Sequence, residues 1–171
     1  PHTDYIRPRC FHPDDGMKIY QSTTSLKKMG NANFDKLLEG VTDKLVENAW
    51  GGLMDAGDWD RRTGHLTVSH MLFDLLLLFP DHFENYSLNI PESRDKIPDI
   101  VDEALFNIDV YRRLQMENGA VRGGIESAEH PKEGEVSWLE SLKVYAYSPG
   151  PMASYHYAGA AAHAAFILRK Y

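Results

Sequence analysis

Two aspartates in a glycine-rich stretch form the most specific chemical pattern in the sequence. Asp55 and Asp58 stand on either side of an Ala-Gly pair within GGLMDAGDWDRR, residues 51–62. Glycine lets a backbone fold tightly, so both carboxylates can point into one small volume and polarise a water molecule there. Such a pair could supply the general base of a hydrolysis. Trp59, beside the pair, offers an aromatic face of the kind that stacks on sugar rings.

The same residues have two simpler interpretations. Asp and Gly dominate ordinary solvated turns, in which aspartate side chains hydrogen-bond to nearby backbone, and this is the commoner case for an isolated Asp-Ala-Gly-Asp. A calcium site made by Asp55, Asp58 and Asp60 is the other interpretation, although the ligand spacing of an EF-hand loop is absent. The motif by itself therefore leaves the choice open.

Charge and hydropathy exclude several classes of partner. The net charge of −7 repels phosphate backbones, so we expect no nucleic-acid partner. The longest apolar run, residues 75–79, is too short to cross a bilayer, so we expect no membrane partner. Cys10 is the only cysteine, which excludes a disulfide within the chain.

Helices separated by long loops are predicted along most of the chain. Apolar residues at helical spacing predict helices over residues 66–79, 98–115 and 153–170, with a shorter helix within 34–48. Pro98 suits the first position of its helix, with acidic residues following it and Arg112 and Arg113 near the other end. We therefore expect an all-α fold.

The segments between the helices are predicted to be irregular. Turn-forming residues dominate residues 1–33, apart from a short strand near 18–20. The connection over 119–149 is long, and such loops are usually functional. The helix over 66–79 is apolar on most sides and should be largely buried. Because the predicted helices cannot cover one another, we expect further helices to belong to this fold.

Four blocks of sequence, in this order and spacing, resemble the family 9 glycoside hydrolases. They are GGLMDAGD at 51–58, IPDIVDEA at 97–104, a Gln-to-Val stretch at 115–121, and a Ser-Pro-Gly turn at 148–150 before an alanine-rich helix. The resemblance implies part of an (α/α)6 barrel with long loops on its active-site face. Residues 51–171 would form the first hairpins, after an irregular lead-in segment over 1–50 that matches poorly.

The resemblance also implies roles for the two aspartates. Asp58 would be the general base that deprotonates the attacking water, and Asp55 would help to hold that water. Two like charges so close would titrate as a unit. The family inverts configuration, which implies an acid carboxyl about 6.5–9.5 Å from the base. The family's acid is a Glu in a motif that this chain lacks, so we assign none and expect the chain alone to be inactive.

Substrate-binding residues follow from the same resemblance. The loop over 123–138 lines the substrate cleft in the family, which makes Glu126, His130 and Trp138 candidate substrate-binding residues together with Trp59. The simpler interpretation of His130 is an exposed loop histidine, and that of Trp138 is a hydrophobic plug beneath the loop.

Supporting and metal-binding residues are less sharply indicated. Arg61 and His65 follow the catalytic turn and would hold an aspartate through charge-assisted hydrogen bonds, or else form surface pairs of little consequence. The spacing of His156 and His163 is unlike a compact metal motif, so we assign no metal ligand. No cofactor is implied; structural calcium occurs in relatives, but no complete ligand set can be named here.

These inferences predict an endoglucanase-like enzyme that cleaves β-1,4-linked glucan. Its partners would be a polysaccharide or oligosaccharide substrate and the remainder of its own chain, and its location would be secreted or periplasmic by resemblance. Two alternatives stay open. One is an exo-acting glucosidase or glucosaminidase on the same scaffold, and the other is a non-catalytic sugar-binding module.

Overall fold

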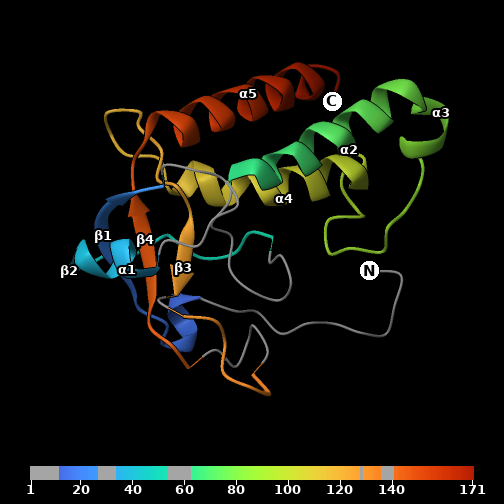
Figure 1. Ribbon diagram of the computed structural model, residues 1–171. Coiled ribbons are helices and arrows are strands. Elements are labelled where there is room, and N and C mark those ends of the chain that lie inside the picture. The colour runs from blue at the N-terminus through green and yellow to red at the C-terminus, as the bar shows by residue number, and fades with distance from the viewer. Residues whose placement is uncertain (1–11, 27–33, 54–62, 128, 136–140) are drawn as a thin grey trace.

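A small sheet lies at one end of three long helices in the computed structural model (Figure 1), which describes residues 12–26, 34–53, 63–127, 129–135 and 141–171. The strands are β1 (Ile19–Ser25), β2 (Val41–Leu45), β3 (Ile125–Ser127) and β4 (Val144–Ser148). The α-helices are α1 (Phe34–Glu39), α2 (Leu66–Leu78), α3 (Pro80–Phe83), α4 (Asp99–Arg113) and α5 (Pro151–Leu168), and the short 3-10 helices are η1 (Pro13–Asp15) and η3 (Thr63–His65).

The sheet shows that the prediction of an all-α fold is wrong. Its strand order is β2-β1-β4-β3, with β1 parallel to β4 and the other two pairs antiparallel. Strand pairing depends on tertiary neighbours more than on local propensity. Ile19 of β1 pairs with Val144 of β4, far along the chain, so local periodicity could not reveal the sheet. Strands from the predicted lead-in segment and from the later part share this sheet, and the predicted boundary at residue 50 stays a prediction.

The helix predicted within 34–48 is shorter than expected because the chain turns at Gly40. Helix α1 ends at Glu39 and β2 begins at Val41. A Cβ at Gly40 would lie 2.6 Å from the Ser22 Oγ atom, closer than real contacts allow. Ser22 Oγ in turn donates to the Leu37 carbonyl at 2.9 Å. Close packing of this turn on β1 therefore ends the helix.

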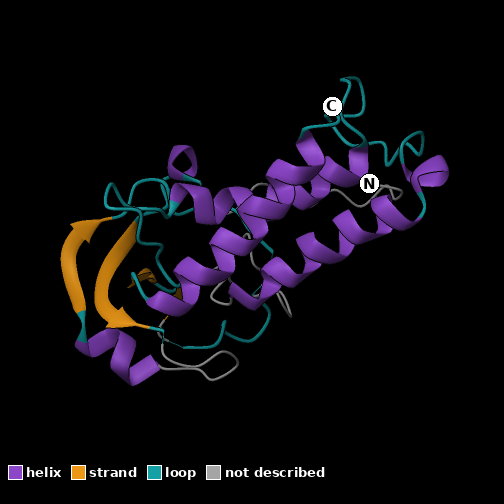
Figure 2. Ribbon diagram, turned by 90° about the horizontal axis from the view of Figure 1, so that it is seen from above, coloured by secondary structure: helices purple, strands orange, loops and turns teal. Residues whose placement is uncertain are grey.

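The three long helices confirm the predicted periodicity. Helices α2 and α4 fall within the predicted ranges, and α5 begins two residues earlier than predicted, at Pro151. Pro98 is the N-cap of α4 rather than its first helical residue. Helix α2 packs against both α4 and α5 (Figures 1 and 2). The fully or nearly fully buried side chains at this junction include Phe73, Val101, Ala104, Tyr111 and Ala160. No helix among the described residues is long and apolar enough to cross a membrane.

Helix α2 is not buried on most sides, contrary to the expectation from its composition. Its residues Leu66, Ser69, Phe73 and Leu76 face the core. Four apolar residues at heptad-like spacing instead form an exposed apolar face of α2: Val68, Met71, Leu75 and Leu78, which are 40%, 60%, 37% and 70% exposed. Within the described part of the chain, nothing covers this face.

A buried acid lies inside the sheet. Glu126 of β3 is fully buried, and the hydroxyl of Tyr147, also fully buried on β4, donates to its Oε2 atom. Arg122, just before β3, is 8% exposed and donates to the Tyr147 carbonyl at 3.2 Å. Buried charges require such partners because burial removes their hydration.

Replacing Tyr147 by Phe is therefore expected to lower the free energy of unfolding by about 1–3 kcal/mol, because the buried Glu126 carboxyl group loses this hydrogen bond. Urea denaturation measures this difference. Tyr155→Phe is the matched control, because Tyr155 is 78% exposed and should change stability by less than about 0.5 kcal/mol. Equal effects for the two substitutions would contradict the role given to the pair.

The first turn of α4 carries crowded carboxyl groups. Asp99 accepts hydrogen bonds from the Leu88 backbone and the Ser93 hydroxyl. Asp102 has a buried Oδ2 atom with no hydrogen-bond partner among the described residues. Burial, together with the neighbouring carboxylates of Asp95 and Glu92 among others, raises the pKa of Asp102 to about 6. The folded protein therefore binds the Asp102 proton more tightly than the unfolded chain does.

Asp102→Asn should stabilise the protein at neutral pH, since the ionised form of Asp102 is disfavoured in the folded state above its raised pKa. We expect a gain of about 1 kcal/mol near pH 7.5, less than the full pKa shift implies because the group is partly solvated. The gain should shrink as the pH falls below 6, where the folded wild type is protonated. Thermal melts near pH 7.5 and below pH 6 measure the gain, with Glu117→Gln as the control. A gain that does not depend on pH would contradict the assignment.

Candidate functional site

The candidate catalytic residues lie mainly outside the described part of the chain. Asp55, Asp58, Trp59 and Arg61 fall within residues 54–62, and Trp138 falls within 136–140. Their predicted roles stay predictions. The structure does describe the residues on both sides of 54–62, and these decide where that segment leaves the fold and where it returns.

The upstream side is held by Arg113, the last residue of α4. Its Nη2 atom donates to the Trp50 carbonyl, and its Nε atom donates to the Asn48 carbonyl at 3.3 Å. The guanidinium also lies 3.8 Å from the centroid of the Trp50 ring, within the range of a cation–π interaction. Its other nitrogen pairs with Asp109. Hydrogen bonds and a cation–π contact therefore hold one short stretch of backbone on the end of α4, and the pair with Asp109 orients the guanidinium from within the same helix.

Two glycines follow immediately, before the candidate catalytic turn. Gly51 has φ +83° and Gly52 has φ +91°, a left-handed backbone conformation that glycine adopts without steric cost. A Cβ at Gly51 would lie 3.2 Å from Arg113 Nη2. The left-handed backbone therefore favours glycine at both positions, and the nearby Arg113 side chain leaves little room for a Cβ at Gly51.

The downstream side is held by α4 and α5 together. The Thr63 Oγ1 and His156 Nδ1 atoms are 3.0 Å apart, which joins η3 to α5. Asn107 of α4 donates through Nδ2 to the His65 carbonyl at 2.8 Å and to Ser69 Oγ at 2.9 Å. His65 is half-buried at the end of η3. Its predicted support of an aspartate stays a prediction.

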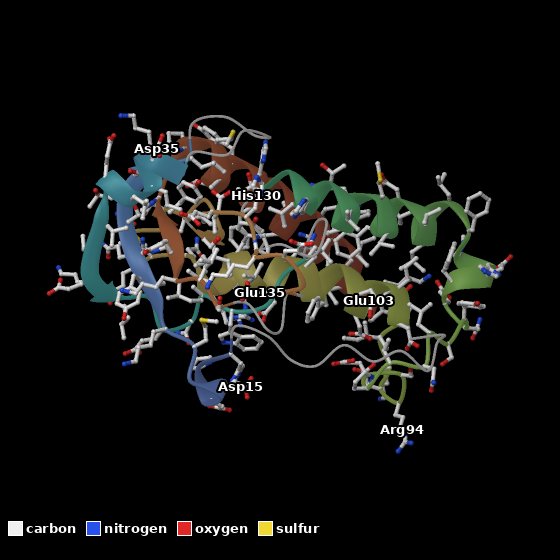
Figure 3. The ribbon with its side chains drawn as sticks, turned by 60° about the horizontal axis from the view of Figure 1, so that its bottom comes forward. Asp15, Asp35, Arg94, Glu103, His130 and Glu135 are labelled. Atoms are coloured by element: carbon white, nitrogen blue, oxygen red, sulfur yellow. The ribbon has the colours of Figure 1, made fainter. Side chains whose placement is uncertain are left out.

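The predicted substrate-binding residues that are described occupy two different environments. Glu126 is buried in the sheet with Tyr147 and is not on the surface. His130 is exposed in the loop between β3 and β4, whereas Glu103 lies on α4 (Figure 3). Substrate contact by Glu126 and His130 stays a prediction. Burial, the largest cause, raises the pKa of Glu103, which lines a hollow with Glu92 at the amino end of α4.

Histidines also join α2 to α5. The Nδ1 atoms of His70 and His163 are 2.9 Å apart, and the His163 Nε2 atom lies 3.8 Å from Asp74 Oδ1. Within the described residues, no group of three or more His, Cys, Asp or Glu could hold a metal ion. His163 thus contacts residues of α2, and His156 contacts Thr63 of η3.

Sequence reasoning missed the residues that hold the two flanks. Arg113 attracted notice only as a cation near the carboxyl end of a helix, a role that Arg112 beside it fills equally well in the sequence. Asn107 stands at a buried helical position where an apolar residue is usual, and that anomaly is the one local signal that could have identified it. Thr63 carries no such signal.

Comparisons with known proteins locate the chain among carbohydrate-cleaving enzymes. No family model matches the sequence. A curated relative, a xyloglucan-specific endo-β-1,4-glucanase of Bacteroides ovatus, is 29% identical over 112 residues, which are 64% of this chain and 17% of that protein.

Several solved structures have folds similar to that of this chain. A metagenome-derived glycoside hydrolase family 9 endoglucanase superposes with a TM-score of 0.66 at 25% identity, covering 88% of this chain and 26% of that one. A family 9 glycoside hydrolase of Bacteroides ovatus gives a TM-score of 0.55 at 19% identity, covering 87% of this chain and 31% of that one. The family 9 endoglucanase J30 gives 0.58 at 20% identity, covering 83% and 26%.

The chain thus spans less than a third of the length of each of these proteins. The similarity nevertheless covers most of the chain itself, in sequence with the curated enzyme and in fold with the solved ones. The resemblance predicted from four sequence blocks is confirmed: this chain is similar to family 9 glycoside hydrolases in sequence and in fold.

Proposed function

We propose that the polypeptide containing this chain hydrolyses β-1,4-glycosidic bonds in a β-glucan. The observation that carries the proposal is the Gly-Gly-x-x-Asp-Ala-Gly-Asp stretch at residues 51–58 in a chain similar to endoglucanases. The anchored flanks on α4 and α5 support it, because a catalytic turn needs a fixed position. Xyloglucan, the substrate in the name of the curated relative, is one β-glucan to test.

In the proposed mechanism, Asp58 takes a proton from a water molecule while that water attacks the anomeric carbon. Asp55 helps to hold the water. Hydrolysis then proceeds in a single step with inversion, which requires a second carboxyl group to protonate the departing sugar oxygen. We assign no such acid within this chain and propose that further polypeptide supplies it, so that this chain alone is inactive. Trp59, His130 and Trp138 are the proposed sugar-binding residues, whereas Glu126 is left out because its side chain is fully buried in the sheet; no redox or organic cofactor is needed.

We also propose that further polypeptide of the same protein covers the apolar face of α2. The face comprises Val68, Met71, Leu75 and Leu78. A separate hollow between α2 and α5 is lined by Leu77, Phe166 and Tyr171 among others. Exposed apolar patches of this kind mark interaction sites. Each matched protein is more than twice as long as this chain, so chain beyond these residues is the occupant we propose.

Asp58→Asn in the intact natural polypeptide should lower kcat for β-glucan hydrolysis by about 10²–10⁴-fold, the usual contribution of a general base. Reducing-sugar assays on xyloglucan and unsubstituted β-1,4-glucan measure it, and NMR of the first product tests inversion. Asp60→Asn is the matched control within the same segment and should keep activity within a few-fold. Glucan binding without hydrolysis by the wild type would favour a sugar-binding module and overturn the proposal, whereas release of monosaccharide alone would favour the exo-acting alternative.

Leu78→Glu in the same polypeptide should behave as a core substitution although Leu78 is 70% exposed here. We expect a loss of more than about 2 kcal/mol in the free energy of unfolding, since a charge would be buried without a partner. Met116→Glu, in an exposed turn, is the control and should cost less than about 0.5 kcal/mol. If Leu78→Glu lowers the denaturation midpoint no more than Met116→Glu does, the apolar face of α2 is not covered.

A further inference from the structure

Arg113 differs sharply from its neighbour Arg112 although both end the same helix. The Arg113 side chain is 11% exposed and that of Arg112 is 63% exposed. Arg112 Nε donates to Asp109 Oδ1 at 2.7 Å on the surface. Arg113 also pairs with Asp109 and in addition reaches the Asn48 and Trp50 carbonyls and the Trp50 ring. Burial lowers the pKa of Arg113, so its contacts must offset a real desolvation cost.

The contacts of Arg113 suit a guanidinium and no other side chain. A guanidinium presents several donors in a rigid plane and can stack on an aromatic ring at the same time, whereas an ammonium is a single point charge. Here the Nε and Nη2 atoms address two carbonyls two residues apart while the plane lies near the Trp50 ring. The backbone just before Gly51 is thereby fixed in both position and orientation.

Helix α4 holds the other side of the same segment. Asn107 Nδ2 donates to the His65 carbonyl, and Arg113 lies six positions after Asn107 on the same helix, which is about 9 Å along the axis. One rigid helix therefore fixes both flanks of residues 51–64. Because α4 is buried along this length, the helix fixes the distance between Asn107 and Arg113, the two residues that hold the flanks.

We propose that Arg113 is a positioning residue for hydrolysis. By holding the Asn48 and Trp50 carbonyls on α4, it fixes the start of the Gly-Gly turn, which in the sequence precedes the proposed catalytic residues Asp55 and Asp58. This inference rests on the function proposed above. The effect is on geometry: a displacement of about 1 Å in a reacting group can cost about 10²-fold in rate. Arg113 itself does not touch the substrate.

The test compares Arg113→Gln, Arg113→Lys and the control Arg112→Gln in the intact natural polypeptide, assayed on β-glucan well below the melting temperature of each variant. Arg113→Gln should lower kcat by about 10–100-fold with KM within about 3-fold, since misplacement affects the chemical step more than binding. Arg113→Lys should fall between Arg113→Gln and the wild type, because its ammonium cannot hold both carbonyls. Arg112→Gln should leave kcat within 2-fold.

Hydrogen exchange of the backbone amides of residues 49–53 separates this inference from the proposed function. The exchange should accelerate in Arg113→Gln and not in Arg112→Gln, whether or not the protein is active. If the wild type hydrolyses glucan and Arg113→Gln keeps kcat within 2-fold, the positioning role is overturned even if its melting temperature falls. If the wild type is inactive, the proposed function fails, and unchanged exchange at 49–53 would then overturn the clamp as well.

Discussion

Burial of α4 is the constraint on which the rest of the structure depends. Its apolar residues Val101, Ala104, Ile108 and Tyr111 are buried in one core with α2 and α5. A helix packed on several sides can neither rotate nor slide without losing close-packed contacts. The polar groups that it carries therefore have fixed positions, and every segment that hydrogen-bonds to them inherits those positions. The described stretches on either side of the candidate catalytic segment are two such segments, because Asn48, Trp50 and His65 all accept hydrogen bonds from α4.

Polar groups on a buried helix lose their hydration, and hydrogen bonds within the protein replace it for some of their atoms but not for all. Asn107 satisfies its amide nitrogen with the His65 carbonyl and Ser69, while its Oδ1 atom is buried without a partner among the described residues. Arg113 satisfies its donors on backbone carbonyls. An apolar residue at either position would avoid the desolvation cost but would release the flank that it holds. Asn107 and Arg113 thus lower the stability somewhat and fix the geometry of the stretches next to the proposed catalytic turn.

Much of the helical part of the fold could be predicted from the sequence. The stripes of apolar residues that predict α2, α4 and α5 are local patterns with a period of 3.6, and burial of those stripes in a core realises them. The Gly-Gly-x-x-Asp-Ala-Gly-Asp stretch and three further blocks indicated the family, because a motif is a property of contiguous residues. The proposed roles of Asp55 and Asp58 rest on that motif. The burial of α2 could not be predicted in the same way, because the composition of a helix does not reveal which neighbours pack against it.

The sequence by itself determined the elements and motifs that reside in neighbouring residues: the three long helices, the turn at Gly51 and Gly52, and the resemblance to glycoside hydrolases. Only the tertiary structure decided the sheet, since Ile19 and Val144 pair across most of the chain and carry no local record of each other. It also decided which of two adjacent arginines holds the candidate site. A helix turns by about 100° per residue, so adjacent side chains diverge, and only the packing of the helix determines which one meets Trp50.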